Sequence, residues 1–350
     1  MSKQRLLFAL AGAGAGNYSR ITAILEELDQ DRFEVALLAQ SHARRRAPRG
    51  LTLYPLLDVT YGAGEFTAWQ VLRHNGSFPL RYWTNRRLAG RALDAFRPDL
   101  LVVDSDFHSL PEARRRRIPI LSINSSPATL AIFKRMARSA ADVLFSYCIE
   151  RIDRRLQSRH ASRILCPAIG DVDTRLANVQ LLAPIVRRQF RSNAAAHDSA
   201  ASFDVGVMLG GSGLGASEID LSRVSHSMVV VGASGGRYPP HAVRLPFTEQ
   251  PAAPLSRCRI LVIQGGFNSV SEAIALGKPA VIVPIPNHVE QLVNAWWADQ
   301  LGFGVMAQAS EAGAIVDRLL QDHRASSRPP SPRCDGAIHA ARLIEDMTSA

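Results

Sequence analysis

The stretch Gln264–Met306 reads QGGFNSVSEAIALGKPAVIVPIPNHVEQLVNAWWADQLGFGVM and contains the clearest structural pattern in the chain. A Gly-Gly turn comes first, and a segment with apolar residues at helical spacing follows it. The apolar run 280–283 comes after Gly277-Lys278-Pro279, and a second helix-period segment begins after Pro286. Turn, helix and strand in this order predict parallel strands joined by crossover helices.

The same alternation continues on both sides of this stretch. The first apolar run is followed by a predicted helix with Ile21, Ile24, Leu25 and Leu28 on one face. Residues 337–347 also have helical character. The predicted strands are Leu6–Leu10, Phe33–Leu38, Leu100–Val103, Ile118–Ile123, Asp204–Leu209, Met228–Val231, Ile260–Ile263 and Ala280–Val283.

The length of the chain, 350 residues, is about twice that of a typical domain. The segment 187–202 is polar, rich in Ala and Ser and without periodicity, which is typical of a linker. We therefore predict an α/β protein of two doubly wound, Rossmann-like domains that face one cleft. The expected bounds are 1–190 for an N-terminal domain, 203–323 for a C-terminal domain, and 337–348 for a final helix that can pack back on the N-terminal domain.

The net charge of +10 is distributed unevenly along the chain. Residues 1–191 hold 30 Lys and Arg against 17 Asp and Glu, a net charge of +13, whereas residues 192–350 have a net charge of −3. A basic N-terminal half suggests an anionic partner such as a membrane surface or a phosphorylated substrate, and a solvated Arg-rich surface is the alternative. Nucleic acid is not expected, because no recognisable reader motif accompanies the charge.

The cysteines and the N-terminus both favour a cytoplasmic protein. Cys148, Cys166, Cys258 and Cys334 lie far apart without a C-x-x-C pair, which argues against a zinc site or a disulfide framework. The strongly apolar part of the N-terminus spans only residues 6–10, which is short for a signal peptide. The expected location is cytoplasmic, with peripheral contact at the inner face of the membrane as an option.

Glycine-rich turns follow three of the predicted strands, at residues 12–16, 210–215 and 265–266. Open α/β sheets bind ligands beyond the carboxyl ends of their strands, where free N–H groups and the helix dipole can hold a phosphate. Glycine also lets the backbone approach a ligand closely. Any one of these glycines could simply make a turn, but three turns in register with strand ends favour a phosphate-bearing ligand.

Two other enzyme classes do not fit these glycines. Residues 211–216 match a dinucleotide pattern, but neither candidate second strand ends in the acid that a dehydrogenase needs for the ribose. Residues 232–236 match the G-x-S-x-G elbow of hydrolases, yet Pro239 and Pro240 follow where the elbow's helix would begin. We therefore set aside the dehydrogenase and the hydrolase elbow.

Residues 264–306 resemble the donor-binding signature of the GT-B glycosyltransferases. The shared features are a Gly-Gly turn, a helix with an early Ser-Glu, Gly-x-Pro, an apolar strand ending in Pro, and Glu-Gln before Asn-Ala. The stretch is most similar to the branch of peptidoglycan enzymes that add N-acetylglucosamine to lipid I. The resemblance is strong over 204–310 and diffuse elsewhere.

This resemblance implies that the C-terminal domain binds a nucleotide-sugar donor and the N-terminal domain binds the acceptor. It implies no metal or other cofactor, because helix dipoles and backbone amides would replace a cation at the diphosphate. Glu272 would hold the ribose hydroxyls, although it could instead close a capping box with Ser269. The implied donor-binding residues are Gly211, Ser212, Phe247, Gly265, Gly266, Asn268, Ser269, Glu272, His288, Glu290 and Gln291.

The catalytic base departs from the family pattern. The first glycine loop of the family often carries a histidine, but this chain has Asn17 there, and an amide cannot act as a base. Asp104, Asp106 and His108 follow a predicted strand at an edge that should face the cleft, so Asp106 or His108 is the predicted base. A turn Asp that caps a helix is the alternative. The predicted acceptor-side loop contains Gly14, Gly16, Asn17 and Arg20.

The predicted activity is inverting transfer of a sugar from a nucleotide diphosphate donor, expected to be a UDP-sugar, to an acceptor hydroxyl. A lipid-linked, phosphorylated acceptor would suit the basic N-terminal half, and a soluble small molecule is the other option. Two alternative functions stay open. One is a nucleotide-sugar epimerase or hydrolase on the same scaffold, and the other is a non-catalytic donor-binding subunit, which the presence of Asn17 makes worth keeping.

Overall fold

A computed structural model of the protein describes residues 3–10, 15–47, 50–58, 73, 77–192, 201–209, 218–232, 235–248, 250–321 and 333–349. Of the predicted site residues, Gly14, Gly211 and Ser212 lie outside the described residues. Within the described ranges, no helix combines the length and the apolar character needed to cross a membrane.

The N-terminal part of the chain folds around a parallel sheet, in which seven described strands have the order β3-β2-β1-β4-β5-β6-β7. The winding reverses between β1 and β4, which is where doubly wound sheets bind ligands. The strands are β1 Gln4–Leu10, β2 Phe33–Ala39, β3 Thr52–Pro55, β4 Leu100–Asp104, β5 Ile120–Ile123, β6 Arg163–Pro167 and β7 Val179–Leu182. The helices are α1 Ala15–Leu25, α2 Ser41–Arg45, α4 Phe78–Phe96, α5 Ser109–Arg115, α6 Ser126–Phe133, the 3-10 helix η1 Ala140–Val143 and α7 Leu144–His160.

The C-terminal part repeats this topology in a second parallel sheet, in which six described strands have the order β10-β9-β8-β11-β12-β13. Two doubly wound sheets confirm the predicted fold class. The strands are β8 Phe203–Met208, β9 Met228–Val231, β10 Val243–Leu245, β11 Cys258–Gln264, β12 Ala280–Val283 and β13 Gly304–Met306. The helices are α9 Ala252–Ser256, α10 Phe267–Ala275, α11 Val289–Gln300 and α12 Ala312–Gln321.

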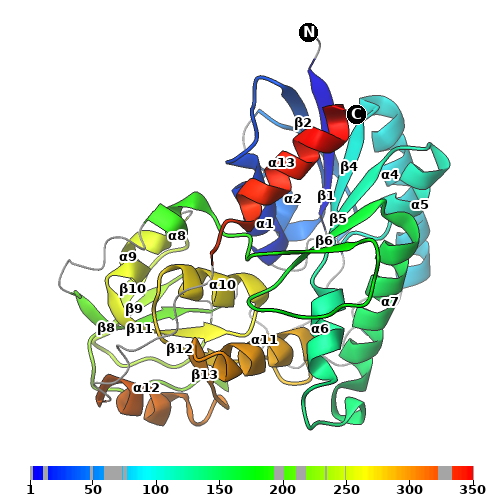
Figure 1. The fold of residues 1–350 in the computed structure, drawn as a ribbon. Coiled ribbons are helices and arrows are strands. Elements are labelled where there is room, and N and C mark those ends of the chain that lie inside the picture. The colour runs from blue at the N-terminus through cyan, green and yellow to red at the C-terminus, as the bar shows by residue number, and fades with distance from the viewer. Residues whose placement is uncertain are drawn as a thin grey trace.

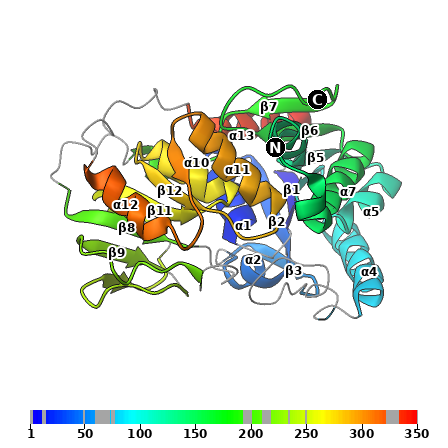
Figure 2. The same ribbon diagram turned by 90° about the horizontal axis from the view of Figure 1, so that it is seen from below.

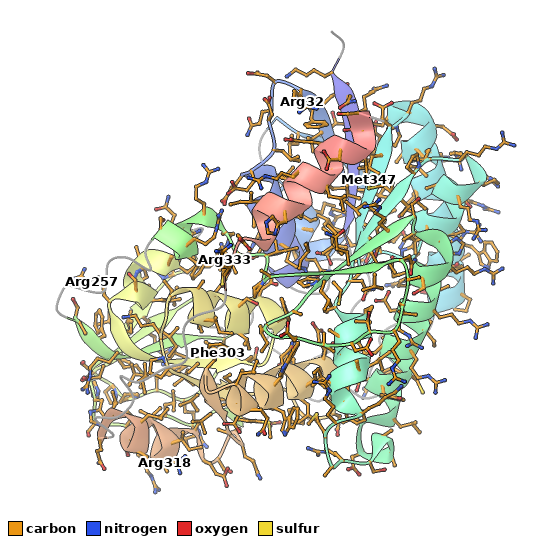
Figure 3. All side chains as sticks on the ribbon, in the orientation of Figure 1. Arg32, Arg257, Phe303, Arg318, Arg333 and Met347 are labelled. Atoms are coloured by element: carbon orange, nitrogen blue, oxygen red, sulfur yellow. The ribbon has the colours of Figure 1, made fainter. Side chains whose placement is uncertain are left out.

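The last helix, α13 Gly336–Ser349, packs on the N-terminal sheet. Ala340 and Ile344 are buried in the same apolar cluster as Leu6 of β1. Figure 1 shows α13 lying beside α1, far from the C-terminal sheet. Figure 3 places Arg32 and Met347 at that end of the molecule, and Arg32 forms an ion pair of 3.6 Å with Glu345. The chain therefore crosses between the two sheets twice.

The first crossing is more ordered than the sequence predicts. Segment 187–202 begins with the short helix α8 Arg188–Ser192, whereas the whole segment was expected to be an irregular linker. The reason is Phe190, which is fully buried in an apolar cluster shared by both parts of the chain. One aromatic side chain in a polar sequence gives no periodicity, so the sequence pattern does not reveal this helix.

The two sheets are joined by direct packing as well as by the chain. One apolar cluster contains Ile132 and Phe133 of α6 together with Val289 and Leu292 of α11. Figure 2 shows the two sheets side by side, with α1, α10 and α11 between them. This arrangement brings the start of α10 and α11 against the carboxyl edge of the N-terminal sheet.

Candidate active site

The N-termini of α1 and α10 meet between the two sheets. Helix α10 begins directly after Gly265-Gly266 at the end of β11, and α1 begins at Ala15, within the first glycine-rich stretch of the sequence. The side chain of Asn268 bridges them, because its Nδ2 donates to the carbonyl oxygen of Gly16. Asn268 Oδ1 is buried and has no hydrogen-bond partner among the described residues. Two helix N-termini in contact create a positive field that suits an anionic ligand.

The backbone amides in the first turn of α10 have no acceptor among the described residues. Gly266 is the N-cap residue and provides no side chain to accept their hydrogen bonds. No described group accepts a hydrogen bond from the amides of residues 267–269. Ser269 lies inside the helix rather than at its N-cap, so the alternative of a capping box between Ser269 and Glu272 is wrong. The amides are therefore available to a ligand.

In the glycine turn at residues 265–266, Gly265 is packed tightly against α11. A Cβ atom on Gly265 would lie 2.4 Å from the backbone oxygen of Gln291, whereas a Cβ atom on Gly266 would meet nothing within 4 Å. Asn294 Nδ2 also donates to the carbonyl of Gly265 at 3.0 Å. Gly265 is thus required for packing, and Gly266 borders open space.

The start of α11 is held by the N-terminal part of the chain. Ser146 Oγ donates to the carbonyl of Asn287 at 2.6 Å and accepts from the amide of Val289 at 3.1 Å. Ser125 Oγ donates to Glu290 Oε1 at 3.4 Å. These bonds place Glu290, which is half-buried, at the boundary between the two sheets.

His288 and Gln291, the two other predicted donor residues near Glu290, have different surroundings. The side-chain oxygen of Gln291 accepts from the amide of Ile285 at 3.1 Å, which leaves its amide nitrogen to face other groups. His288 is the N-cap residue of α11, and burial lowers its pKa below the ordinary value. The three predicted donor residues of this segment therefore lie at one helix start.

Glu272 forms an ion pair that the sequence does not predict. Its side chain is 7% exposed, and its Oε1 accepts from Arg187 Nε at 3.2 Å and from Arg187 Nη2 at 2.8 Å. Burial raises the pKa of Glu272, and the guanidinium of Arg187 opposes that rise. Arg187 lies at the start of the predicted linker, where no pattern in the sequence indicates a site residue.

Phe247, which was predicted to lie near the nucleotide base, contacts a residue of the N-terminal part of the chain. Its side chain is 49% exposed, and the guanidinium carbon of Arg46 lies 3.5 Å from its ring centroid. Gly232 at the end of β9 has a φ of +60° and fits closely against it, because a Cβ atom there would lie 3.2 Å from the ring. Arg46 belongs to the N-terminal part, so this stacking contact also joins the two parts.

The predicted acceptor-side residues cluster around a buried ion pair. Arg20 Nε and Nη2 donate to the two carboxylate oxygens of Asp104 at 2.9 and 2.6 Å, and Nη2 also donates to Asn17 Oδ1 at 3.1 Å. Burial by itself would lower the pKa of Arg20, but the carboxylate of Asp104 raises it. Burial raises the pKa of Asp104, and the guanidinium of Arg20 opposes that rise. The structure therefore brings Asn17, Arg20 and Asp104 together at the carboxyl edge of β1 and β4.

Asp106 and His108 form a second, separate pair. His108 Nδ1 lies 2.8 Å from Asp106 Oδ1, and Asp106 Oδ2 accepts from both the amide and the hydroxyl of Ser109. Burial would raise the pKa of Asp106, but these bonds lower it, so the carboxylate stays ionised. The side chains of Asp106 and His108 are only 1% and 2% exposed, and the rings of Tyr82 and Phe107 flank the imidazole. Asp106 thus holds the start of α5, and the pair lies out of reach of solvent.

A third polar group at this edge comes from α6 and α7 and is absent from the sequence prediction. Asn124 Nδ2 donates to Asp153 Oδ2 at 2.5 Å, and Gln157 Nε2 donates to Asp153 Oδ1 at 3.2 Å. Ser126 Oγ lies 2.5 Å from Glu150 Oε2 and 3.1 Å from Asp153 Oδ2. Glu150 and Asp153 are half-buried, unlike the Asp106–His108 pair.

The hydroxyl group of Ser126 lies between two carboxyl groups, and one of these must carry a proton if both contacts are hydrogen bonds. A serine hydroxyl has a single proton, so both of its contacts are hydrogen bonds only if one carboxyl group is protonated. Burial raises the pKa of Asp153 too, but the hydrogen bonds that it accepts from Asn124 and Gln157 oppose that rise, which favours Glu150 as the group that carries the proton. Burial and the nearby charge of Glu290 raise the pKa of Glu150 to about 8. A carboxyl group with such a pKa can accept a proton near neutral pH.

Known proteins match both the donor-binding stretch and the whole chain. A family model described as Glycosyl transferase family 1 matches residues 241–322. The UDP-N-acetylglucosamine--N-acetylmuramyl-(pentapeptide) pyrophosphoryl-undecaprenol N-acetylglucosamine transferase of Mesorhizobium japonicum is 23% identical over 379 aligned positions, which cover 100% of this chain and 96% of the relative.

Solved structures show the same fold. MurG of Acinetobacter baumannii has a TM-score of 0.58 and 16% identity, and the match covers 98% of this chain and 99% of that one. LpCGTa, solved in complex with UDP, has a TM-score of 0.62 and 15% identity, with 99% of each chain covered. The family model, the full-length relative and the two doubly wound sheets together identify the chain as a glycosyltransferase of the GT-B fold, similar to the lipid II-forming N-acetylglucosaminyltransferases.

Proposed function

We propose that the protein transfers a sugar, with inversion and without a metal ion, from a UDP-sugar to the hydroxyl group of a second substrate. The observation that carries this proposal is the set of amides at residues 267–269, which have no acceptor among the described residues and lie where α10 meets α1. A diphosphate against these amides would be stabilised by the field of the helix, which takes the place of a cation. The choice of UDP is supported by the name of the Mesorhizobium relative and by the UDP complex of LpCGTa.

The residues around α10 have suitable chemistry for the rest of the donor. Glu272, next to the diphosphate position, offers a carboxylate to the two ribose hydroxyls. Phe247 offers an exposed ring for the base, in competition with Arg46. Glu290 and the amide nitrogen of Gln291, which has no acceptor among the described residues, lie at the start of α11, where the sugar would contact them. We propose Gly265, Gly266, Asn268, Ser269 and His288 as the remaining described donor-site residues.

We propose Glu150 as the group that accepts the proton of the attacking hydroxyl. The acceptor oxygen forms a bond to the anomeric carbon on the face opposite the diphosphate, the bond from that carbon to the phosphate oxygen breaks, and the nucleoside diphosphate leaves with the electron pair. The acceptor's proton passes to the ionised form of Glu150, which predominates above a pH of about 8. One displacement inverts the configuration at the anomeric carbon. Glu150 is half-buried beside Glu290, whereas Asp106 and His108 are enclosed, which favours Glu150 over the base predicted from the sequence.

We propose that the acceptor is lipid-linked and that α4 brings the protein to the membrane surface. Leu80 and Trp83 on α4 are 70% and 56% exposed, and Arg87 and Arg91 continue the same exposed face. Apolar side chains beside arginines suit an anionic interface. The name of the Mesorhizobium relative, which includes a pyrophosphoryl-undecaprenol acceptor, supports this choice.

The double variant L80Q/W83Q tests the membrane contact. We expect its binding to vesicles of anionic phospholipid to fall on the order of tenfold, because two large apolar side chains no longer enter the interface. Sedimentation with vesicles measures the binding. Val243→Gln, at an exposed apolar residue of the C-terminal sheet, is the matched control and should bind like the wild type. Equal binding by the double variant and the wild type would remove α4 from the proposal.

A thermal-shift panel of UDP, TDP, GDP and CMP with their sugars tests the proposed donor. At a hundred times its dissociation constant a ligand stabilises the fold by about 2.7 kcal/mol, which raises Tm on the order of 5 °C. We expect UDP and a UDP-sugar to give this shift. Incubation with each nucleotide sugar alone then separates the alternatives, because turnover without an acceptor is the property of an epimerase or hydrolase. Absence of a shift with every nucleotide would reject the donor site.

A further inference from the structure

The ion pair between Arg187 and Glu272 links the chain crossing to the proposed ribose site. Both side chains are largely buried, at 11% and 7% exposure, and the guanidinium contacts a single carboxylate oxygen, Oε1, through two nitrogens. No described group donates to Oε2, the second oxygen of Glu272. A carboxylate held through one oxygen in this way has its other oxygen available to a ligand.

Arg187 is itself fixed in place by its surroundings. Val186 before it is 1% exposed, and the guanidinium carbon lies 5.0 Å from the ring centroid of Phe190, which is fully buried. Gln189 Oε1 accepts from the amide of Ala252 at 3.3 Å, which ties α8 to the C-terminal part. The cation is therefore held against α10 by packing and does not depend on Glu272 alone for its position.

Among the described charged groups on the elements around α10, Arg187 is the one that forms an ion pair with Glu272. Helices α1, α8 and α11 and strands β11 and β12 pack against α10. The other charged groups on these elements have neighbours of their own: Arg20 with Asp104, Arg188 and Arg191 with Glu27, Glu290 with Ser125, Asp299 with the amide of Met306, and Arg259 with Asp204. Among the described groups, Arg187 is the one that opposes the effect of burial on the pKa of Glu272.

We infer that Arg187 is a positioning residue that keeps Glu272 ionised and oriented for the ribose hydroxyls of the donor. This inference rests on the proposed function, because it assigns a role within the same donor site. A protonated carboxyl group accepts hydrogen bonds less well and can accept fewer of them than a carboxylate. Burial disfavours the ionised form of Glu272, so without the neighbouring cation its proton would be retained to higher pH.

The variant Arg187→Met tests the inference through the pH dependence of donor binding. We expect its dissociation constant for UDP to rise on the order of tenfold at pH 7 and to approach the wild-type value as the pH is raised further, because a higher pH favours the ionised form of Glu272. The sign follows from the removal of a cation, which raises the pKa of a carboxyl group. Arg187→Lys keeps the charge and should recover part of the affinity. In turnover, KM for the donor should rise while kcat changes little.

Arg188→Met is the matched control, because Arg188 follows Arg187 in the chain, is exposed, and pairs with Glu26 and Glu27 instead. We expect it to bind UDP like the wild type at every pH. A pH-independent loss of affinity in Arg187→Met, with no recovery in Arg187→Lys, would show a merely structural role and overturn the inference. Failure of the wild type to bind UDP would instead overturn the proposed function, so the two failures are distinguishable.

Discussion

Replacement of Glu150 by glutamine should lower the rate of sugar transfer by about 10²- to 10⁴-fold, the usual contribution of a general base. The amide has the size of the carboxyl group and can still bond to Ser126, but it cannot accept the acceptor's proton. Donor binding should be unchanged, because Glu150 lies on α7 and the donor site is on α10 and α11. Initial rates with a saturating UDP-sugar and acceptor, together with UDP affinity, measure the two effects.

The pH dependence of the wild type gives a second test of the same group. Burial and the charge of Glu290 raise the pKa of Glu150 to about 8, so the group is protonated and inactive as a base below that pH. Activity should rise about tenfold per pH unit below 8 and level off above it, whereas Glu150→Gln should give a flat, low profile. Asp153, Ser126, Glu290 and Asp104 face this group and belong to the same titrating network.

A loss of activity in Glu150→Gln should not result from unfolding of the variant. The raised pKa means that the folded protein retains a proton that the unfolded chain has lost, so Glu150 costs stability as the pH rises toward 8. Glu150→Gln should therefore be at least as stable as the wild type, with an advantage that grows up to that pH. Asp142→Asn, at an exposed carboxylate, is the activity control. If Asp106→Asn or His108→Ala abolishes transfer while Glu150→Gln does not, the buried pair is the base.

Alanine at Gly265 should disrupt the donor site through the backbone. The added Cβ atom would lie 2.4 Å from the backbone oxygen of Gln291, so α10 and α11 must move apart. We expect a loss of about 1–3 kcal/mol in the free energy of unfolding, as for other overpacked sites, together with loss of UDP binding. Chemical denaturation measures the first effect and calorimetric titration the second.

Alanine at Gly266 is the matched variant, with the same change one residue further on. Its Cβ atom meets nothing within 4 Å and its φ of −61° suits alanine, so the stability should stay within about 0.5 kcal/mol of the wild type. The methyl group borders the open space beside the amides of 267–269, where the diphosphate is proposed to lie. UDP affinity should therefore fall on the order of tenfold by steric exclusion. Wild-type affinity in this variant would place the diphosphate elsewhere.

Much of the fold could be predicted from apolar runs bounded by glycine or proline. Strands β9 and β12 have the predicted bounds, 228–231 and 280–283, because each is a buried run of four apolar residues. The strands that were not predicted include β3, β7, β10 and β13, in which most residues are half-buried or exposed. Such short strands lack an apolar signal, and pairing with a neighbour defines them.

The site was predicted where polar residues follow a strand, as at Asp104 after β4. The same signal follows β5 at Asn124 and Ser126 and could have been used. Glu150 and Asp153 could not be found in this way, because they lie in an Arg-rich helix that resembles a solvated surface. Their position beside Asn124 and Ser126 depends on how α7 packs against α5 and α6, which no local pattern reveals.

Hydrogen–deuterium exchange with and without saturating UDP tests the central claim most directly, because it resolves the first turn of α10. The amides of residues 267–269 have no described acceptor in the free protein, so they should exchange readily there and become protected when UDP binds. Protection centred on 265–272 is the expected result. Saturating UDP that stabilises the protein but leaves this segment exchanging as before would contradict a diphosphate held at the start of α10.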